Sequence, residues 1–248
     1  MTLEQFFAEN REVAIAFSGG VDSAYLLYAA TRYAARVKAY YVSTAFQPAF
    51  ELADARRLAD ELGADMLVLH VDVLMSGAVV ANPPDRCYHC KNTLFRQILR
   101  AAENDGFPVL LDGTNASDDA GDRPGMRALR ELSVRSPLRE CGLTKAEIRR
   151  LSREAGLFTW DKPAYACLAT RIRTGEEITL QKLKQSEKAE GFLFGLGFRD
   201  FRVRMVGNTA KLELRKADLP LLLENREKIV TELRKDYDSV LLNLEVRK

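Results

Sequence analysis

Short apolar runs alternate with amphipathic segments along the first two-thirds of the chain. The runs have the length of buried strands, and the segments between them carry apolar residues at helical spacing. Strands are predicted over residues 13–17, 37–42, 66–71 and 109–112, and helices over residues 22–35, 49–62, 90–103 and 144–154. Strands that alternate with helices form crossover units, so we expect an α/β fold with a doubly wound parallel sheet.

Two loops interrupt this pattern. Residues 112–126 are rich in Gly, Asp and Asn, and residues 161–176 contain one Pro and one Cys. Loops at the carboxyl ends of parallel strands carry ligands in open α/β sheets. We interpret both as active loops and the second as a domain hinge.

The order of predicted helices and strands changes after Gly175. Helices are predicted over residues 177–193 and 219–235, and strands over residues 201–206, 209–214 and 239–244, with Gly207-Asn208 as a hairpin turn. This is the size of a small α+β domain. We therefore predict two domains, residues 1–172 and 173–248.

Composition narrows the class of protein. The chain has 248 residues, 47% of them hydrophobic and 29% charged, with a formal net charge of +2. These values are typical of a globular protein and give no support for a nucleic-acid partner. The N-terminus does not resemble a secretion signal, and no apolar run approaches the ~20 residues that span a bilayer. We expect a cytoplasmic protein without membrane contact, whose four cysteines are not structural disulfides.

The most informative segment is Ser18-Gly19-Gly20-Val21-Asp22-Ser23, between the first strand and the first helix of the alternating pattern. Two glycines let the backbone approach a ligand closely. Backbone N–H groups, two hydroxyls and a helix N-terminus then converge on an anion. The segment is neither the Lys-containing Walker loop nor the dinucleotide fingerprint. It predicts a phosphate site, whereas the simpler interpretation is a glycine turn with a helix cap.

SGGVDS in this position resembles the loop of the PP-loop (N-type) ATP pyrophosphatases. The resemblance implies cleavage of ATP to AMP and pyrophosphate with Mg²⁺, with the loop holding pyrophosphate and Asp22 placing the metal. It also implies Ser43 and Thr44 beside the adenosine, and a second phosphate-side loop made of Gly113, Thr114, Asn115 and Asp118. A solvated acidic loop is the simpler interpretation of that second segment.

The cysteines suggest a further centre. Cys87 and Cys90 form a C-x-x-C pair at a predicted helix start, which suits zinc, an iron–sulfur cluster or a dithiol. With Cys167, three thiolates can hold a 4Fe–4S cluster that leaves one iron open to sulfide. An incidental buried thiol pair is the alternative. Cys141 has no partner in sequence, and we interpret it as a packing residue.

The segment KPAYACLATRI around Cys167 resembles the cysteine loop of the LarE family of ATP-dependent sulfur transferases, within the PP-loop superfamily. RPGMRALRELSVRSPL and FRVRMVG extend the similarity over nearly the whole chain. The resemblance implies adenylation of the carboxylates of a pyridinium dicarboxylate mononucleotide and their conversion to thiocarboxylates for the nickel-pincer nucleotide of lactate racemase. Sulfur then comes either from Cys167, which becomes dehydroalanine, or from a three-cysteine 4Fe–4S cluster, which the C-x-x-C pair favours.

Charged residues complete the predicted site. Arg202 and Arg204 lie two apart on a strand, so they point the same way, and they resemble the family's phosphate-site arginines. Alternating surface arginines are the simpler interpretation. Glu190 matches a family active-site position, and Arg171 follows the cysteine loop. We predict Cys167, Arg171 and Glu190 as catalytic residues.

Rival functions remain open at this level. Another PP-loop enzyme is one, either a tRNA thiolase, which the near-neutral charge disfavours, or an amidating synthetase. A nucleotide- and iron–sulfur-binding regulator without turnover is the other. Pyrophosphate release with candidate acceptors separates them. We expect a small-molecule substrate and a homo-oligomer.

Overall fold

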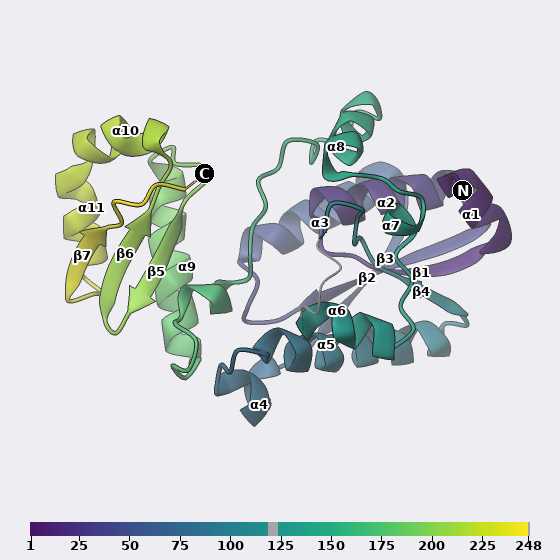
Figure 1. Ribbon diagram of the computed structural model, residues 1–248, viewed down its shortest axis with the longest axis horizontal. Helices are drawn as coiled ribbons and strands as arrows, with labels where there is room; N and C mark the ends of the chain where they lie inside the picture. Colours follow the sequence, from purple (N-terminus) through teal and green to yellow (C-terminus); the bar gives the residue numbers. More distant parts are fainter. Residues whose placement is uncertain (119–123, 248) are drawn as a thin grey trace. The chain divides into compact units, whose positions relative to one another are not determined.

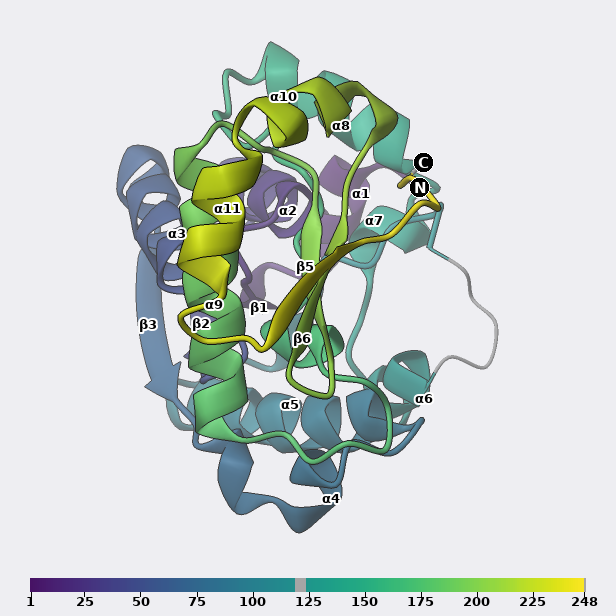
Figure 2. The ribbon, with the colours of Figure 1, turned by 90° about the vertical axis from the view of Figure 1, so that its left-hand side faces the viewer.

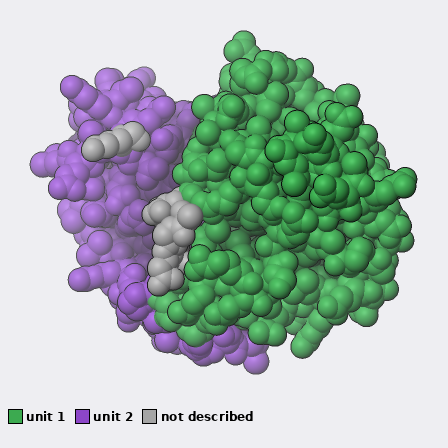
Figure 3. All heavy atoms as spheres, turned by 45° about the vertical axis from the view of Figure 1, so that its right-hand side comes forward, with its two compact units in different colours: residues 1–73, 85–165 green, residues 74–84, 166–248 purple. Residues whose placement is uncertain are grey.

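The computed structural model describes residues 1–118 and 124–247. Residues 119–123, part of the loop predicted over residues 112–126, lie outside the described residues. The chain forms two compact units (Figure 3). Unit 1 comprises Met1–Val73 and Asp85–Tyr165, and unit 2 comprises Leu74–Pro84 and Ala166–Lys248. The domain boundary predicted after residue 172 stays a prediction.

Unit 1 is built on a parallel sheet of strand order β3-β2-β1-β4 (Figure 1). The strands are β1 (Glu12–Ala16), β2 (Arg36–Ser43), β3 (Asp65–His70) and β4 (Val109–Leu111). The helices of this unit are α1 (Leu3–Glu9), α2 (Val21–Tyr33), α3 (Ala49–Leu62), α5 (Arg86–Asn104), α6 (Pro124–Glu131), α7 (Pro137–Glu140) and α8 (Lys145–Glu154). The predicted strand and helix alternation is confirmed.

Both faces of this sheet are covered, because successive residues of a strand point to opposite faces. Val13 and Ile15 belong to a core that also contains residues of α1, α2, α3 and α8. Ala14 belongs to a second core, with Tyr40 and with Ile98 of α5. Helices on both faces of a parallel sheet confirm the doubly wound fold.

Side-chain caps mark the starts of α1 and α8. The predicted capping box of α8 is present, with the Glu147 N–H donating to Thr144 Oγ1 at 3.3 Å. The helix predicted from Cys90 begins earlier, at Arg86, so both cysteines of the C-x-x-C pair lie in its first turns. Helix α1 was not predicted, although Thr2 and Gln5 form a capping box there.

Unit 2 holds a three-stranded sheet of order β5-β6-β7 (Figure 2). Its strands are β5 (Arg202–Val206), β6 (Thr209–Glu213) and β7 (Ser239–Leu242), and its helices are α4 (Gly77–Val80), α9 (Leu180–Gly195), α10 (Leu219–Glu224) and α11 (Arg226–Leu233). The 3₁₀ turns of the chain are η1 (Val73–Met75), η2 (Leu168–Arg171) and η3 (Lys216–Asp218). Strand β6 pairs antiparallel with β5 and parallel with β7, which confirms the α+β character of this part.

Two details of unit 2 correct or refine the prediction. The hairpin turn forms where predicted, with Gly207 at φ +57°. The single helix predicted over residues 219–235 is wrong, since Asn225 ends α10 and begins α11. Its side-chain Nδ2 donates to the Leu221 carbonyl at 3.0 Å, and such a local bond competes with continued helix.

Residues 74–84 join unit 2 through Asn82, which is buried and has φ +52°. Its Nδ2 donates to the carbonyls of Arg173 at 2.9 Å and Glu176 at 3.2 Å. The Gly175 N–H donates to the Asn82 carbonyl at 2.8 Å. A segment distant in sequence therefore braces the chain after the cysteine loop.

None of the helices in the described ranges is long and apolar enough to cross a membrane.

Candidate active site

The phosphate loop joins β1 to α2, as the sequence predicts. Gly19 has φ +71°, a conformation that favours glycine, and Gly20 is the N-cap of α2 without a side-chain cap. Ser23 Oγ accepts from the Ser18 N–H at 3.3 Å and donates to the Gly20 carbonyl at 3.1 Å. The two serines brace the loop, and the N-terminal amides of α2 remain for an anion.

The loop after β4 lies directly against the start of α2. A Cβ added to Gly113 would lie 2.9 Å from the Ser23 backbone nitrogen, so only glycine fits there. The buried Asp112 carboxylate accepts from Thr114 Oγ1 at 2.5 Å and from Ser136 Oγ at 2.6 Å. These contacts fix the chain on either side of Gly113.

The remainder of this loop is held by its own side chains. Asp118 Oδ2 accepts from the Asn115 N–H at 2.8 Å, and Asn115 Oδ1 accepts from the Ser117 N–H at 2.8 Å. Buried Asn115 therefore shapes the loop, whereas Asp118 faces the cavity between the two loops.

The two predicted loops enclose a cavity of about 310 Å³ in unit 1. Its walls are Ala16, Ser18, Gly20, Asp22, Ser23, Lys91, Phe95, Asp112, Gly113, Thr114 and Asp118. Lys91 and Phe95 were not predicted as site residues. They follow Cys90 on α5, one and five residues along, and the only sequence signal was this helical spacing.

Asp22 has the environment of a metal ligand. Its Oδ2 accepts from Lys145 Nζ at 2.6 Å, whereas its buried Oδ1 has no partner among the described residues. Burial raises the pKa of this carboxyl, and the bond to Lys145 opposes that rise. An unmatched carboxylate oxygen beside a phosphate-sized cavity fits Mg²⁺, which takes one or two carboxylates together with substrate phosphates. Lys145 was not predicted.

Four other predicted nucleotide-site residues do not line this cavity. Gly19 and the buried Val21 shape the loop from behind. Thr44 Oγ1 donates to Gln47 Oε1 at 2.7 Å, and the Ser43 carbonyl accepts from the Val71 N–H at 3.1 Å. The contact of Ser43 and Thr44 with adenosine stays a prediction.

Cys87 and Cys90 lie in unit 1, three residues apart on α5 and so on one side of that helix. Cys87 is exposed, Cys90 is half-buried, and Arg86 Nη2 donates to Cys87 Sγ at 3.6 Å. Cys167 belongs to unit 2. Within residues 1–118 and 124–247, no group of three or more His, Cys, Asp or Glu is placed to hold a metal ion. The 4Fe–4S cluster stays a prediction.

The cysteine loop of unit 2 is held by hydrogen bonds between its own residues. Cys167 precedes η2, and its carbonyl accepts from the Thr170 N–H at 2.9 Å and from Thr170 Oγ1 at 2.8 Å. Arg171 Nη1 donates to the Ala166 carbonyl at 3.0 Å. The carbonyls of Cys167 and of Ala166 before it are therefore both held by hydrogen bonds.

Arg171 and Glu190 form a buried pair that fixes this loop to α9. Arg171 Nε and Nη2 donate to the two Glu190 carboxylate oxygens at 2.7 and 2.9 Å, and both residues are 1% exposed. The Val203 N–H of β5 also donates to Glu190 Oε1, at 2.9 Å. Their predicted catalytic roles stay predictions, and the geometry gives them a fastening role.

A second cavity, of about 440 Å³, lies beside the cysteine loop in unit 2. Its walls are Thr170, Arg171, Ile172, Arg173, Thr174, Arg204, Met205, Val206 and Lys211. Arg204 lies here, with Nε donating to both Glu213 oxygens at 2.9 Å and Nη1 donating to the Thr170 carbonyl. Arg202 is not among the walls. It is buried, donates to the Phe201 carbonyl, and has its pKa lowered by burial and by Arg171.

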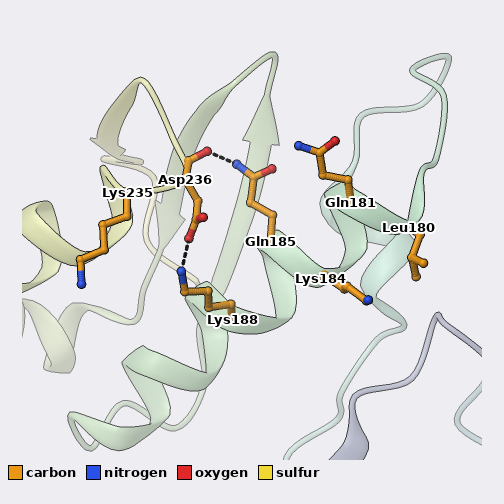
Figure 4. A pocket seen from close by; sticks show the side chains of 7 residues that line it. All are labelled: Leu180, Gln181, Lys184, Gln185, Lys188, Lys235 and Asp236. Atoms are coloured by element: carbon orange, nitrogen blue, oxygen red, sulfur yellow. Dashed lines mark hydrogen bonds and ion pairs between the residues drawn. The ribbon is translucent and has the colours of Figure 1, made fainter.

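A third cavity, of about 590 Å³, lies along α9 (Figure 4). It carries Lys184, Lys188 and Lys235, but the last two are paired, with Asp236 at 2.7 Å and with Glu232 respectively. Gln185 Nε2 donates to the Asp236 carbonyl. Two of its three lysines are thus already paired with carboxylates.

Comparisons with known proteins agree with this geometry. The asparagine synthase family model matches residues 4–118. The pyridinium-3,5-bisthiocarboxylic acid mononucleotide synthase of Lactiplantibacillus plantarum is 32% identical, over 94% of this chain and 85% of that protein. The uncharacterized protein slr1717 of Synechocystis is 39% identical over 86% of this chain and 80% of that protein. The tRNA-specific 2-thiouridylase MnmA of Thermotoga petrophila is 26% identical over 59% of this chain and 52% of that protein.

A parallel sheet whose first strand runs through a glycine loop into a helix, with the loop after β4 closing the cavity, defines a PP-loop fold. The similarity to the L. plantarum synthase, over 94% of this chain, identifies the family within the PP-loop proteins. The chain belongs to the LarE-like sulfur transferases of the PP-loop ATP pyrophosphatase superfamily.

Proposed function

We propose that this protein is an ATP-dependent sulfur transferase acting on a pyridinium dicarboxylate mononucleotide, and that its product serves the nickel-pincer nucleotide of lactate racemase. One observation carries the proposal. The two loops at the carboxyl ends of β1 and β4 enclose a cavity lined by Asp22, whose buried Oδ1 has no hydrogen-bond partner within residues 1–118 and 124–247. The relative from L. plantarum, whose name gives a bisthiocarboxylic acid mononucleotide as product, supports the choice of acceptor.

The ATP half of the reaction belongs to unit 1. The amides of Ser18–Ser23 hold the pyrophosphate, with Gly113, Thr114 and Asp118 on the opposite wall. A substrate carboxylate oxygen attacks the α-phosphorus, the bond to the pyrophosphate oxygen breaks, and an acyl adenylate forms. When bound at Asp22, Mg²⁺ supplies charge that stabilises the departing pyrophosphate.

The acceptor half belongs to unit 2. Arg173, Arg204 and Lys211 line the cavity beside the cysteine loop, and the last two share one carboxylate, Glu213, so positive charge is in excess among them. Guanidinium groups match phosphate oxygens in shape as well as charge. This cavity is our choice for the phosphate of the mononucleotide. Arg202 acts one layer behind it, since it is buried and does not line the cavity.

We propose Cys167 as the sulfur donor or as a ligand of the donor. As donor, its thiolate attacks the acyl carbon and AMP leaves. A base then removes the Cα proton while the Cβ–S bond breaks, which releases the thiocarboxylate and leaves dehydroalanine without any change in overall redox state. Alternatively, Cys87, Cys90 and Cys167 hold a 4Fe–4S cluster, which when bound supplies an open iron for sulfide.

Mass spectrometry tests this proposal. Full-length protein, purified without oxygen, is incubated with ATP, Mg²⁺ and the pyridinium substrate, while pyrophosphate release is followed. Loss of the elements of hydrogen sulfide at Cys167 identifies the cysteine as donor. Thiolated product with Cys167 intact and with iron and acid-labile sulfide present identifies the cluster. Absence of pyrophosphate with this acceptor contradicts the proposal, and release that requires tRNA supports a tRNA thiolase instead.

The homo-oligomer, the cytoplasmic location and the absence of a nucleic-acid partner stay predictions.

A further inference from the structure

Lys162, which belongs to the predicted active loop over residues 161–176 but was given no role of its own, reaches the phosphate loop. Lys162 Nζ donates to Asp54 Oδ2 at 2.7 Å and to the Gly19 carbonyl at 3.4 Å, and lies 4.0 Å from Glu51 Oε1. The Lys162 side chain is only 14% exposed. All of these residues belong to unit 1.

Two carboxylates of α3 explain how the charged ammonium group of Lys162 can stay buried. Glu51 is as poorly exposed as Lys162, at 14%, and burial raises the pKa of its carboxyl while Lys162 opposes that rise. Two carboxylates of α3 compensate the desolvation of one ammonium group, and buried charges persist only when compensated in this way. The ammonium group donates one hydrogen bond to Asp54 and another to the phosphate loop, at the Gly19 carbonyl.

The bond to Gly19 constrains one peptide plane. Because a peptide unit is planar and trans, the Gly19 carbonyl and the Gly20 N–H point in opposite directions. Gly20 lines the phosphate cavity, whereas Gly19 does not, and a Cβ on Gly19 would lie 3.1 Å from Ala55 of α3. The carbonyl therefore faces α3 and Lys162. The Gly20 N–H donates to Ser18 Oγ at 3.5 Å, and a charged pyrophosphate oxygen is a stronger acceptor that can replace this hydroxyl.

We propose that Lys162 is a positioning residue of the phosphate loop, which holds the Gly19–Gly20 peptide so that the Gly20 N–H points at the pyrophosphate. The proposal rests on the proposed function of the cavity as the pyrophosphate site. Lys162 touches no reacting atom, so its effect passes through the orientation of a backbone donor. Its loss weakens the grip on pyrophosphate and leaves the adenosine contacts unchanged.

Binding of two probes tests this role. The variant Lys162→Met keeps the chain length and removes the charge. We expect its affinity for inorganic pyrophosphate with Mg²⁺ to fall about tenfold, as when a hydrogen bond to a charged group is lost, with adenosine affinity unchanged. Isothermal titration measures both. Asp54→Asn, which keeps an acceptor oxygen but removes its charge, gives a smaller loss. Arg56→Ala, at an exposed position of the same helix, gives none.

The outcomes separate the two proposals. Equal pyrophosphate affinity in Lys162→Met and wild type overturns the role of Lys162, and so does an equal loss of pyrophosphate and adenosine affinity. If Lys162→Met does not fold, Asp54→Asn decides by the same criterion. Wild-type protein that binds pyrophosphate but thiolates no acceptor contradicts the proposed function alone. Wild-type protein that does not bind pyrophosphate contradicts both.

Discussion

The two units bury a carboxylate in opposite ways. In unit 1, Asp22 bonds to Lys145 through one oxygen, and its other oxygen is buried without a partner among the described residues. In unit 2, Glu190 bonds to Arg171 through both oxygens and also accepts the Val203 N–H. A buried oxygen without a hydrogen bond destabilises the folded protein, and a ligand that binds this oxygen removes the penalty. A fully hydrogen-bonded pair instead holds the surrounding residues in place.

This difference distinguishes a carboxylate that can bind a ligand from one that holds the neighbouring chain in place. Asp22 lies on the wall of the phosphate cavity, where a cation would complete its coordination. Glu190 is 1% exposed, and Arg171 ties it to the residues on both sides of Cys167. A charged residue near an active loop is therefore not by itself evidence of catalysis. What distinguishes the two roles is whether the polar atoms of the residue are already hydrogen-bonded.

The largest effect should follow from breaking the satisfied pair. Arg171→Met leaves the Glu190 carboxylate buried without its cation, which lowers the free energy of unfolding by about 3–5 kcal/mol. Thermal unfolding of the full chain, with hydrogen exchange of the β5 amides, measures this. Arg173→Met, on the same cavity but exposed, should unfold like wild type. Arg171→Met protein that is fully stable yet inactive would contradict this expectation and support the catalytic role predicted from sequence.

The next effect concerns the contact between the two loops of unit 1. Gly113→Ala places a Cβ 2.9 Å from the Ser23 nitrogen, so the backbone of one loop must move. Displacing positioned groups by about 1 Å costs about 100-fold in rate. ATP-dependent pyrophosphate release should fall by that factor. Gly191→Ala, where the added Cβ meets nothing within 4 Å, is the matched control. Unchanged release in Gly113→Ala would show that the two loops do not act together.

A smaller effect is expected from the unsatisfied carboxylate itself. Asp22→Asn keeps the shape and one oxygen but removes the negative charge that draws Mg²⁺ to the cavity. The Mg²⁺ concentration that gives half-maximal pyrophosphate release should rise about tenfold, the scale found when the surroundings of a metal site are altered. Asp60→Asn, at an exposed position of α3, should match wild type. An unchanged Mg²⁺ requirement would mean that other groups hold the metal.

The smallest effect is expected at Asp105, an exposed carboxylate of unit 1. It serves as the comparison for the two buried carboxylates, Asp22 and Glu190. Asp105 accepts from Tyr40 at 2.7 Å and lies 3.0 Å from Lys38 Nζ, and these partners lower its pKa in the folded state. Its stabilising contribution is therefore present above the ordinary pKa and disappears as the pH falls through the lowered one. Asp105→Asn should reduce stability near neutral pH, and the difference from wild type should vanish in acid. Urea unfolding across pH measures it, and a difference that grows in acid would contradict the assignment.

Local sequence was sufficient for the fold and for the position of the glycine loop, whereas the roles of the predicted site residues stay predictions. Alternating runs predicted the four parallel strands, and the SGGVDS loop was found at the predicted junction of β1 and α2. The helix break at Asn225 was missed because residues 219–235 are amphipathic throughout and the competing bond to Leu221 is a single side-chain contact. Arg202 was grouped with Arg204 because both share one strand face, yet only Arg204 lines the cavity.

The sequence by itself determined the glycine loop that is predicted to bind an anion, because the glycine conformation, the serine braces and the helix N-terminus all arise within six consecutive residues. Only the tertiary structure decided which cations serve that loop. Lys145 reaches Asp22 across 123 positions of sequence, and Lys162 reaches Gly19 across 143. Such pairings have no local signal, since they depend on how α8 and the segment after it return to the sheet. The same reason applies to Arg171 and Glu190, which the sequence predicts separately as catalytic residues and which the tertiary structure brings together as a buried ion pair.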